Sequence, residues 1–148
     1  MLKIDELSAG YGKVQVLHGV SINVPRGHVV TLIGSNGAGK TTTMRAVSGM
    51  IAPTGGTITL NGKRIDGLEP YHVAKLGLAH SPEGRRVFAT MSVTDNLTLG
   101  AFPRLTGSRP RGDVPADLER ALELVELALA GGEVPPSLWS GGAQFVIS

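Results

Sequence analysis

Short runs in which apolar and polar residues alternate fill the first part of the chain. Met1–Leu7 alternates loosely, and Val14–Val24 carries β-branched residues at alternating positions, which predicts two strands joined by a glycine turn. The continuous apolar run His28–Ile33 predicts a strand buried on both faces, as in a parallel sheet. This run leads directly into Gly34, and a helix is predicted to begin after Gly39. The order of strands and helix is typical of an α/β protein.

Turns that contain glycine or asparagine separate the elements predicted in the middle of the chain. Thr57–Leu60 predicts a strand, and Asn61–Gly62 behind it predicts a hairpin-type turn. Tyr71–Leu76 predicts a short helix, and the apolar run Leu78–Ser81 predicts another buried strand. The α/β pattern therefore continues through this part of the chain.

Helical periodicity dominates the last part of the chain. Ser92–Leu99 reads as the start of a helix, with Ser92 or Thr94 as its cap and an acidic residue in its first turn. A polar loop is predicted for Arg104–Val114, and an amphipathic helix for Asp117–Ala130, where charged residues stand between apolar ones. The apolar stripe of that helix consists of Leu118, Leu122, Val125 and Leu129.

Composition is that of a soluble globular protein of one domain. The 148 residues suit one domain, and a hydrophobic share of 41% is enough for a buried core, although aromatic residues make up only 4%. No apolar run reaches the roughly 18–20 residues that span a bilayer, and the first residues lack the features of a secretory signal. The chain has 0 cysteines, which excludes disulfides and cysteine-ligated metals and fits a reducing cytosol. The net charge of +2 is spread without a basic stripe, so nucleic acid is not an expected partner.

One glycine-rich segment carries a complete phosphate-binding motif, the P-loop. Residues 34–41 fit G-x-x-x-x-G-K-[ST] and lie between a predicted strand and a predicted helix. Glycines permit positive φ, so that successive backbone N–H groups form a nest for an anion, and the helix dipole points at the same place. The ammonium of Lys40 would bind the β- and γ-phosphates, and the Thr41 hydroxyl would bind Mg²⁺. The residues predicted to hold the nucleotide here are Gly34, Ser35, Asn36, Gly37, Ala38, Gly39, Lys40, Thr41 and Thr42.

The P-loop by itself does not separate kinases, GTPases and motor or transporter ATPases, and a plain glycine turn with an incidental lysine is the structural alternative to it. Four further segments narrow this choice. They are Tyr11, Leu17–Ser21, Ser81–Leu97 with the letters S-P-E-G-R-R-V-F-A-T-M-S-V-T-D-N-L, and Ser140–Gln144 with the letters S-G-G-A-Q. Together with the P-loop they resemble the N-terminal part of an ATP-binding subunit of an ABC transporter. Ser81–Leu97 is the most specific match and is similar to the branched-chain amino acid importers.

This resemblance implies roles for residues around the nucleotide. Tyr11 would stack on adenine, which requires only a π-face, although a tyrosine can also plug a turn. Glu83 stands where the family contacts Mg²⁺ and the attacking water, so the resemblance implies Thr41 and Glu83 as metal ligands. A surface Glu83 that forms an ion pair with Arg85 or Arg86 is the alternative.

The resemblance also implies two protein partners. A signature-like segment would bind the γ-phosphate held by a second ATP-binding subunit, in a homodimer or heterodimer. Trp139 and Ala143 depart from the family pattern, and the letters S-G-G also arise by chance in a glycine-rich chain. The segment Glu83–Phe88 would contact the membrane permease subunits, with a solvated basic loop as the alternative. The signature residues expected at that phosphate are Ser140, Gly141 and Gly142.

The resemblance does not extend to the family's catalytic carboxylates. No apolar run in the 148 residues ends in Asp-Glu, and the 4 histidines all precede the signature-like segment, so none matches the family's switch histidine. We therefore expect a P-loop NTPase core that is incomplete at its C-terminus, with an unpaired edge beside the P-loop strand. A polypeptide of these residues alone is expected to hydrolyse ATP barely or not at all.

The resulting hypothesis is an α/β P-loop NTPase core with an N-terminal antiparallel β region (1–33), a segment from the P-loop helix to the family's Q-loop (34–100), and a helical segment up to the signature-like motif (101–148). It would bind ATP and Mg²⁺ in the subunit that powers uptake of branched-chain or related amino acids, on the cytoplasmic face of the cell membrane. A non-hydrolysing nucleotide-binding fragment or regulator is the main alternative. A soluble ABC protein of translation or repair is disfavoured, because such proteins carry long insertions or tandem cassettes.

Overall fold

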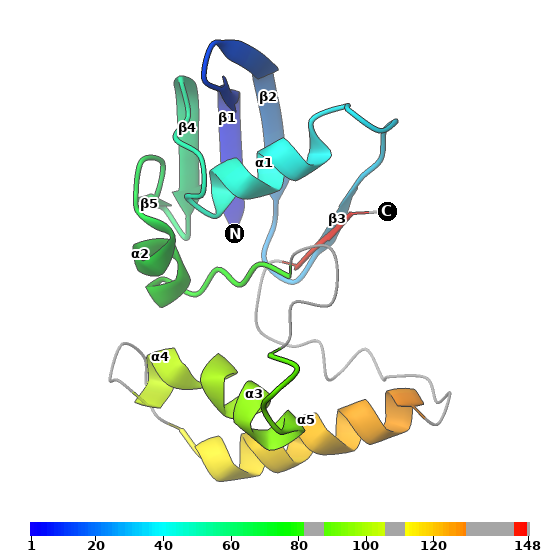
Figure 1. Cartoon of the computed structure of the whole chain (residues 1–148). Helices are drawn as coiled ribbons and strands as arrows, with labels where there is room; N and C mark the ends of the chain where they lie inside the picture. The colour runs from blue at the N-terminus through cyan, green and yellow to red at the C-terminus, as the bar shows by residue number, and fades with distance from the viewer. Residues whose placement is uncertain (82–87, 106–111, 130–143, 148) are drawn as a thin grey trace. The chain divides into compact units, whose positions relative to one another are not determined.

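The computed structural model of the chain describes residues 1–81, 88–105, 112–129 and 144–147 (Figure 1). The chain divides into two compact units, Met1–His80 with Gly141–Ser148, and Ser81–Ser140. None of the helices in the described ranges is both long and apolar enough to cross a lipid bilayer.

The first unit is built on a four-stranded antiparallel sheet. β1 (Leu2–Tyr11) lies between β2 (Val14–Val24) and β4 (Gly55–Leu60), and β5 (Lys63–Arg64) pairs with β4 at the edge (Figure 1). The sheet confirms the predicted antiparallel region and adds β4 and β5 to it. Burial along β1 moves from even to odd positions where the pairing with β2 is irregular. The buried positions of β1 are Leu2, Ile4, Leu7 and Ala9.

A hydrophobic core joins this sheet to the helices α1 (Lys40–Val47) and α2 (Pro70–Lys75). α1 crosses the face formed by β1 and β2 (Figure 1), and buries Ala46 and Val47 there. Each large aliphatic side chain that is fully buried stabilises the fold by about 1.5–3 kcal/mol, so aromatic residues are not needed for this core. The core therefore holds β1 and α1 together. Its largest fully buried side chains are Leu2, Ile4, Leu7, Leu17, Ile58, Ile65, Val24, Val47 and Val73.

The hairpin between β4 and β5 forms as predicted. Asn61 and Gly62 have φ of 50° and 80°, as a two-residue hairpin turn with positive φ at both central positions requires. Asp66 fastens the end of this hairpin, because its Oδ1 accepts a hydrogen bond from the backbone N–H of Ile58 at 3.0 Å. Its Oδ2 lies 2.6 Å from Nη2 of Arg64 in an ion pair. The carboxylate of Asp66 thus ties the loop after β5 back to β4.

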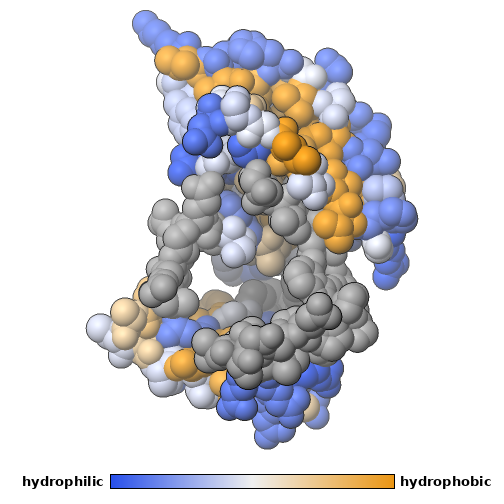
Figure 2. All heavy atoms as spheres, turned by 90° about the vertical axis from the view of Figure 1, so that its right-hand side faces the viewer, coloured by the Kyte–Doolittle hydropathy of each residue, from blue (hydrophilic) through white to orange (hydrophobic). Residues whose placement is uncertain are grey.

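The strand ahead of the glycine-rich loop differs from its prediction. β3 (Val29–Leu32) pairs in parallel with β6 (Gln144–Ile147), so the predicted unpaired edge is wrong for the edge that β6 occupies. Val29 is 62% exposed and Ile33 is 87% exposed, so the predicted burial on both faces is also wrong. β3 and β6 form a two-stranded sheet, which by itself cannot bury both faces of β3. In the view of Figure 2, apolar side chains reach the surface of this unit.

The predicted strand Leu78–Ser81 is not a strand in the structure. Leu78 and His80 are half-buried, whereas Ala79 and Ser81 are exposed, and these residues join neither of the two described sheets. An apolar run becomes a strand only where a neighbouring strand accepts and donates its backbone hydrogen bonds. The predicted helix just before this run is confirmed by α2.

The second unit contains a capped helix, α3 (Val93–Gly100). The Oγ of Ser92 accepts a hydrogen bond from the backbone N–H of Asp95 at 3.1 Å, and its O–H donates to Oδ2 of the same aspartate at 2.6 Å. Of the two predicted caps, Ser92 is therefore the correct one and Thr94 is not.

Two more helices are described in this unit, α4 (Phe102–Leu105) and α5 (Val114–Leu129). α4 replaces the start of a segment predicted as a loop. α5 confirms the predicted amphipathic helix but begins ahead of Asp117, because Asp113 accepts hydrogen bonds from its first turn. An ion pair of 2.7 Å between Arg104 and Asp117 joins the two helices. The end predicted for this helix, at residues 130–132, lies outside the described residues.

Candidate nucleotide-binding site

The loop between β3 and α1 follows a path that two glycines permit. Gly37 and Gly39 both have φ of 88°, in the left-handed region that costs other residues about 1–2 kcal/mol. Gly39 is also packed against Leu17, so that an added Cβ would lie 2.6 Å from Leu17 Cδ2. The rest of the loop is exposed. The loop is therefore fixed to the core at Gly39 and presents its remaining backbone to solvent.

Lys40 folds back over this loop. Its Nζ donates hydrogen bonds to the carbonyl oxygens of Gly34 at 2.6 Å and Ser35 at 3.1 Å. An ammonium has three protons, so these two bonds hold its position and leave donor capacity for another acceptor. α1 has no acidic residue in its first turn, so the positive end of its dipole adds to the charge of Lys40. The loop, the lysine and the helix together form a cradle suited to an anion.

The three threonines at the start of α1 have different surroundings. Thr41 is exposed, so its hydroxyl is open to solvent beside Lys40. Thr43 is buried and donates from Oγ1 to the carbonyl oxygen of Gly39 at 3.0 Å. Thr42 is also buried, and its side chain hydrogen-bonds to the hydroxyl of Tyr11. Of these three hydroxyls, that of Thr41 is the one available to a ligand or metal at the loop.

Tyr11, at the end of β1, reaches α1 through its hydroxyl. Nη1 of Arg45 donates a hydrogen bond to this hydroxyl oxygen at 3.1 Å. Hydrogen bonds with Thr42 and then Arg45 hold the pKa of Tyr11 below its ordinary value, because they stabilise the phenolate. The sequence analysis selected Tyr11 but missed Arg45, since a contact between residues 34 positions apart leaves no local pattern.

The structure brings together the P-loop and Tyr11 but does not place every predicted site residue. Glu83, predicted as a metal ligand, lies outside the described residues, as do Arg85 and Arg86. Within the described ranges, no group of three histidine, aspartate or glutamate side chains could hold a metal ion. The signature residues that also lie outside the described residues are Ser140, Gly141 and Gly142.

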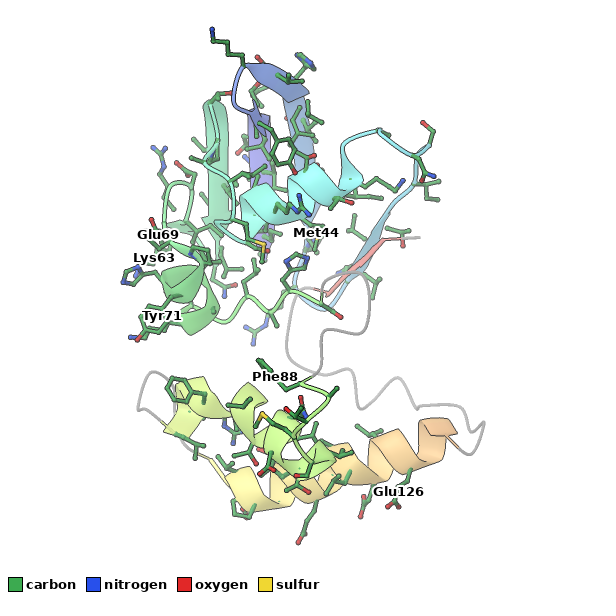
Figure 3. The ribbon with its side chains drawn as sticks, in the orientation of Figure 1. Met44, Lys63, Glu69, Tyr71, Phe88 and Glu126 are labelled. Carbon is green, nitrogen blue, oxygen red and sulfur yellow. The ribbon has the colours of Figure 1, made fainter. Side chains whose placement is uncertain are left out.

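Phe88 ends the segment predicted to contact membrane subunits, and it is 61% exposed (Figure 3). Asn96 fixes its backbone, because Oδ1 accepts from the N–H of Phe88 at 2.9 Å and Nδ2 donates to the carbonyl oxygen of Phe88 at 3.1 Å. Nδ2 also donates to the carbonyl oxygen of Ser92 at 2.9 Å. The sequence analysis gave Asn96 no role, although the residue stands in the stretch that resembles the importers.

Comparisons with known proteins identify the family of the chain. A protein-family model described as ABC transporter matches residues 17–148. The chain belongs to the ABC transporter family. Its fold class is confirmed by a solved structure described as the ATP-binding subunit of an ABC transporter, which is 35% identical with a TM-score of 0.62. That match covers 70% of this ABC chain and 42% of the solved one.

Two curated relatives show how far the likeness extends. The high-affinity branched-chain amino acid transport ATP-binding protein BraG of Pseudomonas aeruginosa is 36% identical over 148 residues, which cover 100% of this ABC chain and 61% of BraG. The hemin import ATP-binding protein HmuV of Rhizobium meliloti is 33% identical over 145 residues, which cover 97% of this chain and 53% of HmuV. The chain thus spans less than two thirds of the length of either relative.

Proposed function

We propose that the chain is the ATP-binding part of an ABC import subunit that powers uptake of branched-chain or related amino acids. The observation that carries this proposal is the cradle at the start of α1, where Lys40 is held over an exposed loop shaped by Gly37 and Gly39. Backbone N–H groups, a fixed ammonium and a helix N-terminus together suit the phosphates of a nucleoside triphosphate. Similarity to BraG across the whole chain supports amino acid import as the process.

The residues of the cradle divide the recognition of ATP between them. Residues 34–39 would surround the phosphates with backbone N–H groups, and Lys40 would bind oxygens of the β- and γ-phosphates. Each charge-assisted hydrogen bond contributes about 1.5–3 kcal/mol, so a few of them account for the roughly 8 kcal/mol of a micromolar complex. Tyr11 is 41% exposed, and its ring would stack on adenine.

The donor groups at the cradle also fit Mg²⁺. This ion keeps several waters and usually takes one or two protein oxygens together with phosphate oxygens, so no cage of carboxylates is required. The exposed hydroxyl of Thr41 supplies one such oxygen, and Glu83 is the second protein ligand that we propose. When bound, the metal would neutralise negative charge that the β- and γ-phosphates share.

Two protein partners and a location belong to the same proposal. Residues 140–142 would contact the γ-phosphate of ATP bound to a second ATP-binding subunit, in a homodimer or heterodimer. The segment Glu83–Phe88 would contact the membrane permease subunits on the cytoplasmic face, and the exposed ring of Phe88 supports such a contact. Nucleic acid has no part in this function. The proposal keeps the division of the chain into an antiparallel β region (1–33), a segment from the P-loop helix to the Q-loop (34–100) and a helical segment up to the signature-like motif (101–148).

Isothermal titration calorimetry of the purified chain with ATP and Mg²⁺ tests the proposal. Lys40→Ala should weaken ATP binding by roughly 10- to 150-fold, because it removes a charge-assisted bond to phosphate. Lys63→Ala is the matched control, since Lys63 is an exposed lysine on the edge strand β5, away from the loop (Figure 3). The control should bind ATP as the wild type does. Equal affinities for the wild type and Lys40→Ala would contradict the proposal.

A further inference from the structure

Tyr11 is held in two places. It is the last residue of β1, and its hydroxyl accepts a hydrogen bond of 3.1 Å from Arg45 on α1. Thr42, on the same helix, hydrogen-bonds to the same hydroxyl. Since Lys40 is the first residue of α1, the helix that holds the Tyr11 hydroxyl also carries the ammonium of the cradle.

Arg45 contacts Tyr11 at the hydroxyl end of its ring. Cζ of Arg45 lies 6.0 Å from the ring centroid, at the limit of the cation–π range, while Nη1 contacts the hydroxyl. In the pair formed by Tyr71 and Lys75, by contrast, the ammonium lies 4.1 Å from the ring centroid. Because the guanidinium stays at the hydroxyl end and Tyr11 is 41% exposed, ring surface is left for a flat aromatic group.

We propose that Arg45 is a positioning residue for the base of the nucleotide. By holding the Tyr11 hydroxyl, it fixes the ring in an orientation in which a purine can stack while the phosphates lie at Lys40. The inference rests on the proposed ATP site and assigns a further residue to it.

The expected gain comes from ordering Tyr11 before the nucleotide binds. Immobilising one side chain at a binding site lowers the affinity by roughly 2- to 12-fold. A ring that is already held before the nucleotide binds avoids this loss. The contact also joins the purine platform to the phosphate cradle through one helix, so that the distance between the two is set by α1 and β1 within the core.

The test compares ATP with tripolyphosphate, which has phosphates but no base, by displacement of a fluorescent ATP analogue from the full chain. Arg45→Met removes the donor and keeps the length of the side chain, whereas Tyr11→Phe removes the acceptor and keeps the ring. Each variant should weaken ATP by roughly 2- to 12-fold and leave tripolyphosphate within error of the wild type. The double variant should be no weaker than Tyr11→Phe alone, because Tyr11→Phe already removes the contact between the hydroxyl and Arg45. Arg26→Met, at an exposed arginine in the turn before β3, should change neither ligand.

Several results would overturn the inference. An equal loss for ATP and tripolyphosphate in Arg45→Met would show that Arg45 acts on the phosphates or on the helix, as would additive losses in the double variant. An unchanged ATP affinity in both single variants, with a loss in Tyr11→Ala, would remove Arg45 and keep the stacking role of Tyr11. Failure of the proposed function is separate and visible in Lys40→Ala, which would then bind ATP like the wild type. Thermal unfolding of each variant shows whether the fold is retained.

Discussion

Replacing Gly39 with alanine would strain the backbone and crowd the core at the same residue. Its φ of 88° costs an alanine about 1–2 kcal/mol. The added Cβ would also lie 2.6 Å from Cδ2 of Leu17, a core residue that is 2% exposed. Displacing Leu17 in a packed core adds about 1–3 kcal/mol. We therefore expect Gly39→Ala to lower the free energy of unfolding by about 2–5 kcal/mol, a large part of the stability of an ordinary domain.

Two other glycines separate the two costs. Gly37 and Gly62 have φ of 88° and 80°, but a Cβ at either position meets no atom within 4 Å. Alanine at each of them should therefore cost about 1–2 kcal/mol from the backbone alone. Gly37→Ala should in addition weaken ATP binding, because Gly37 belongs to the cradle, whereas Gly62→Ala in the hairpin turn should leave it unchanged.

Urea denaturation followed by far-ultraviolet circular dichroism gives the free energy of unfolding of each variant. The expected order places Gly39→Ala well below Gly37→Ala and Gly62→Ala, which should agree with each other. If Gly39→Ala fell within about 0.5 kcal/mol of Gly62→Ala, the usual error of such comparisons, the crowding argument would be refuted. A wild-type ATP affinity in Gly39→Ala would refute the claim that the loop needs its observed path to bind phosphate.

Two further predictions concern polar contacts away from the cradle. The hydrogen bond from Arg64 is the main cause that lowers the pKa of Asp66 below its ordinary value of 3.8, so the stabilisation from this carboxylate is present above pH 3.8 and is lost as the pH falls through the folded pKa. Asp66→Asn should lower the urea midpoint at pH 7 and converge with the wild type in acid, and a difference that stays constant with pH would contradict this. Asn96→Ala should release the backbone of Phe88, with a loss of about 0.5–1.5 kcal/mol for each hydrogen bond and faster hydrogen exchange of the Phe88 amide. Thr98→Ala is the control, because it removes a single hydrogen bond from a hydroxyl to the carbonyl oxygen of Thr94 in the same helix. Unchanged hydrogen exchange at Phe88 in Asn96→Ala would contradict the role of Asn96 in holding this backbone.

Local patterns were sufficient for the parts of the fold that local physics determines. The P-loop occupies consecutive positions, so its strand, loop and helix could be predicted together, and α1 begins where the glycines end. The cap at Ser92 and the positive φ of Asn61 likewise depend on neighbouring residues. For the same reason Tyr11 could be selected by its place ahead of the loop and by the family resemblance.

The contacts that support the site depend on tertiary structure and could not be predicted in this way. Whether His28–Ile33 and Leu78–Ser81 are buried strands depends on which chain segments lie beside them, and apolar letters do not contain that information. Arg45 reads as an ordinary exposed helix residue until β1 brings Tyr11 to it. Asn96 belongs to the segment that resembles the importers, but its hydrogen bonds to the backbone of Phe88 form only because the residues before α3 fold back against this helix.

The two hydrogen bonds from Lys40 to the carbonyl oxygens of Gly34 and Ser35 change the meaning of the usual lysine substitution. In this chain the lysine stabilises the conformation of the loop and also carries the charge that would bind phosphate. Lys40→Ala therefore also changes the unbound protein, because a loop without these two hydrogen bonds has more conformations to lose when ATP binds. The measured loss of affinity will combine the lost phosphate bond with the cost of re-ordering the loop. Acetylation of Lys40, which removes the charge and keeps one N–H donor, would reduce the first contribution more than the second.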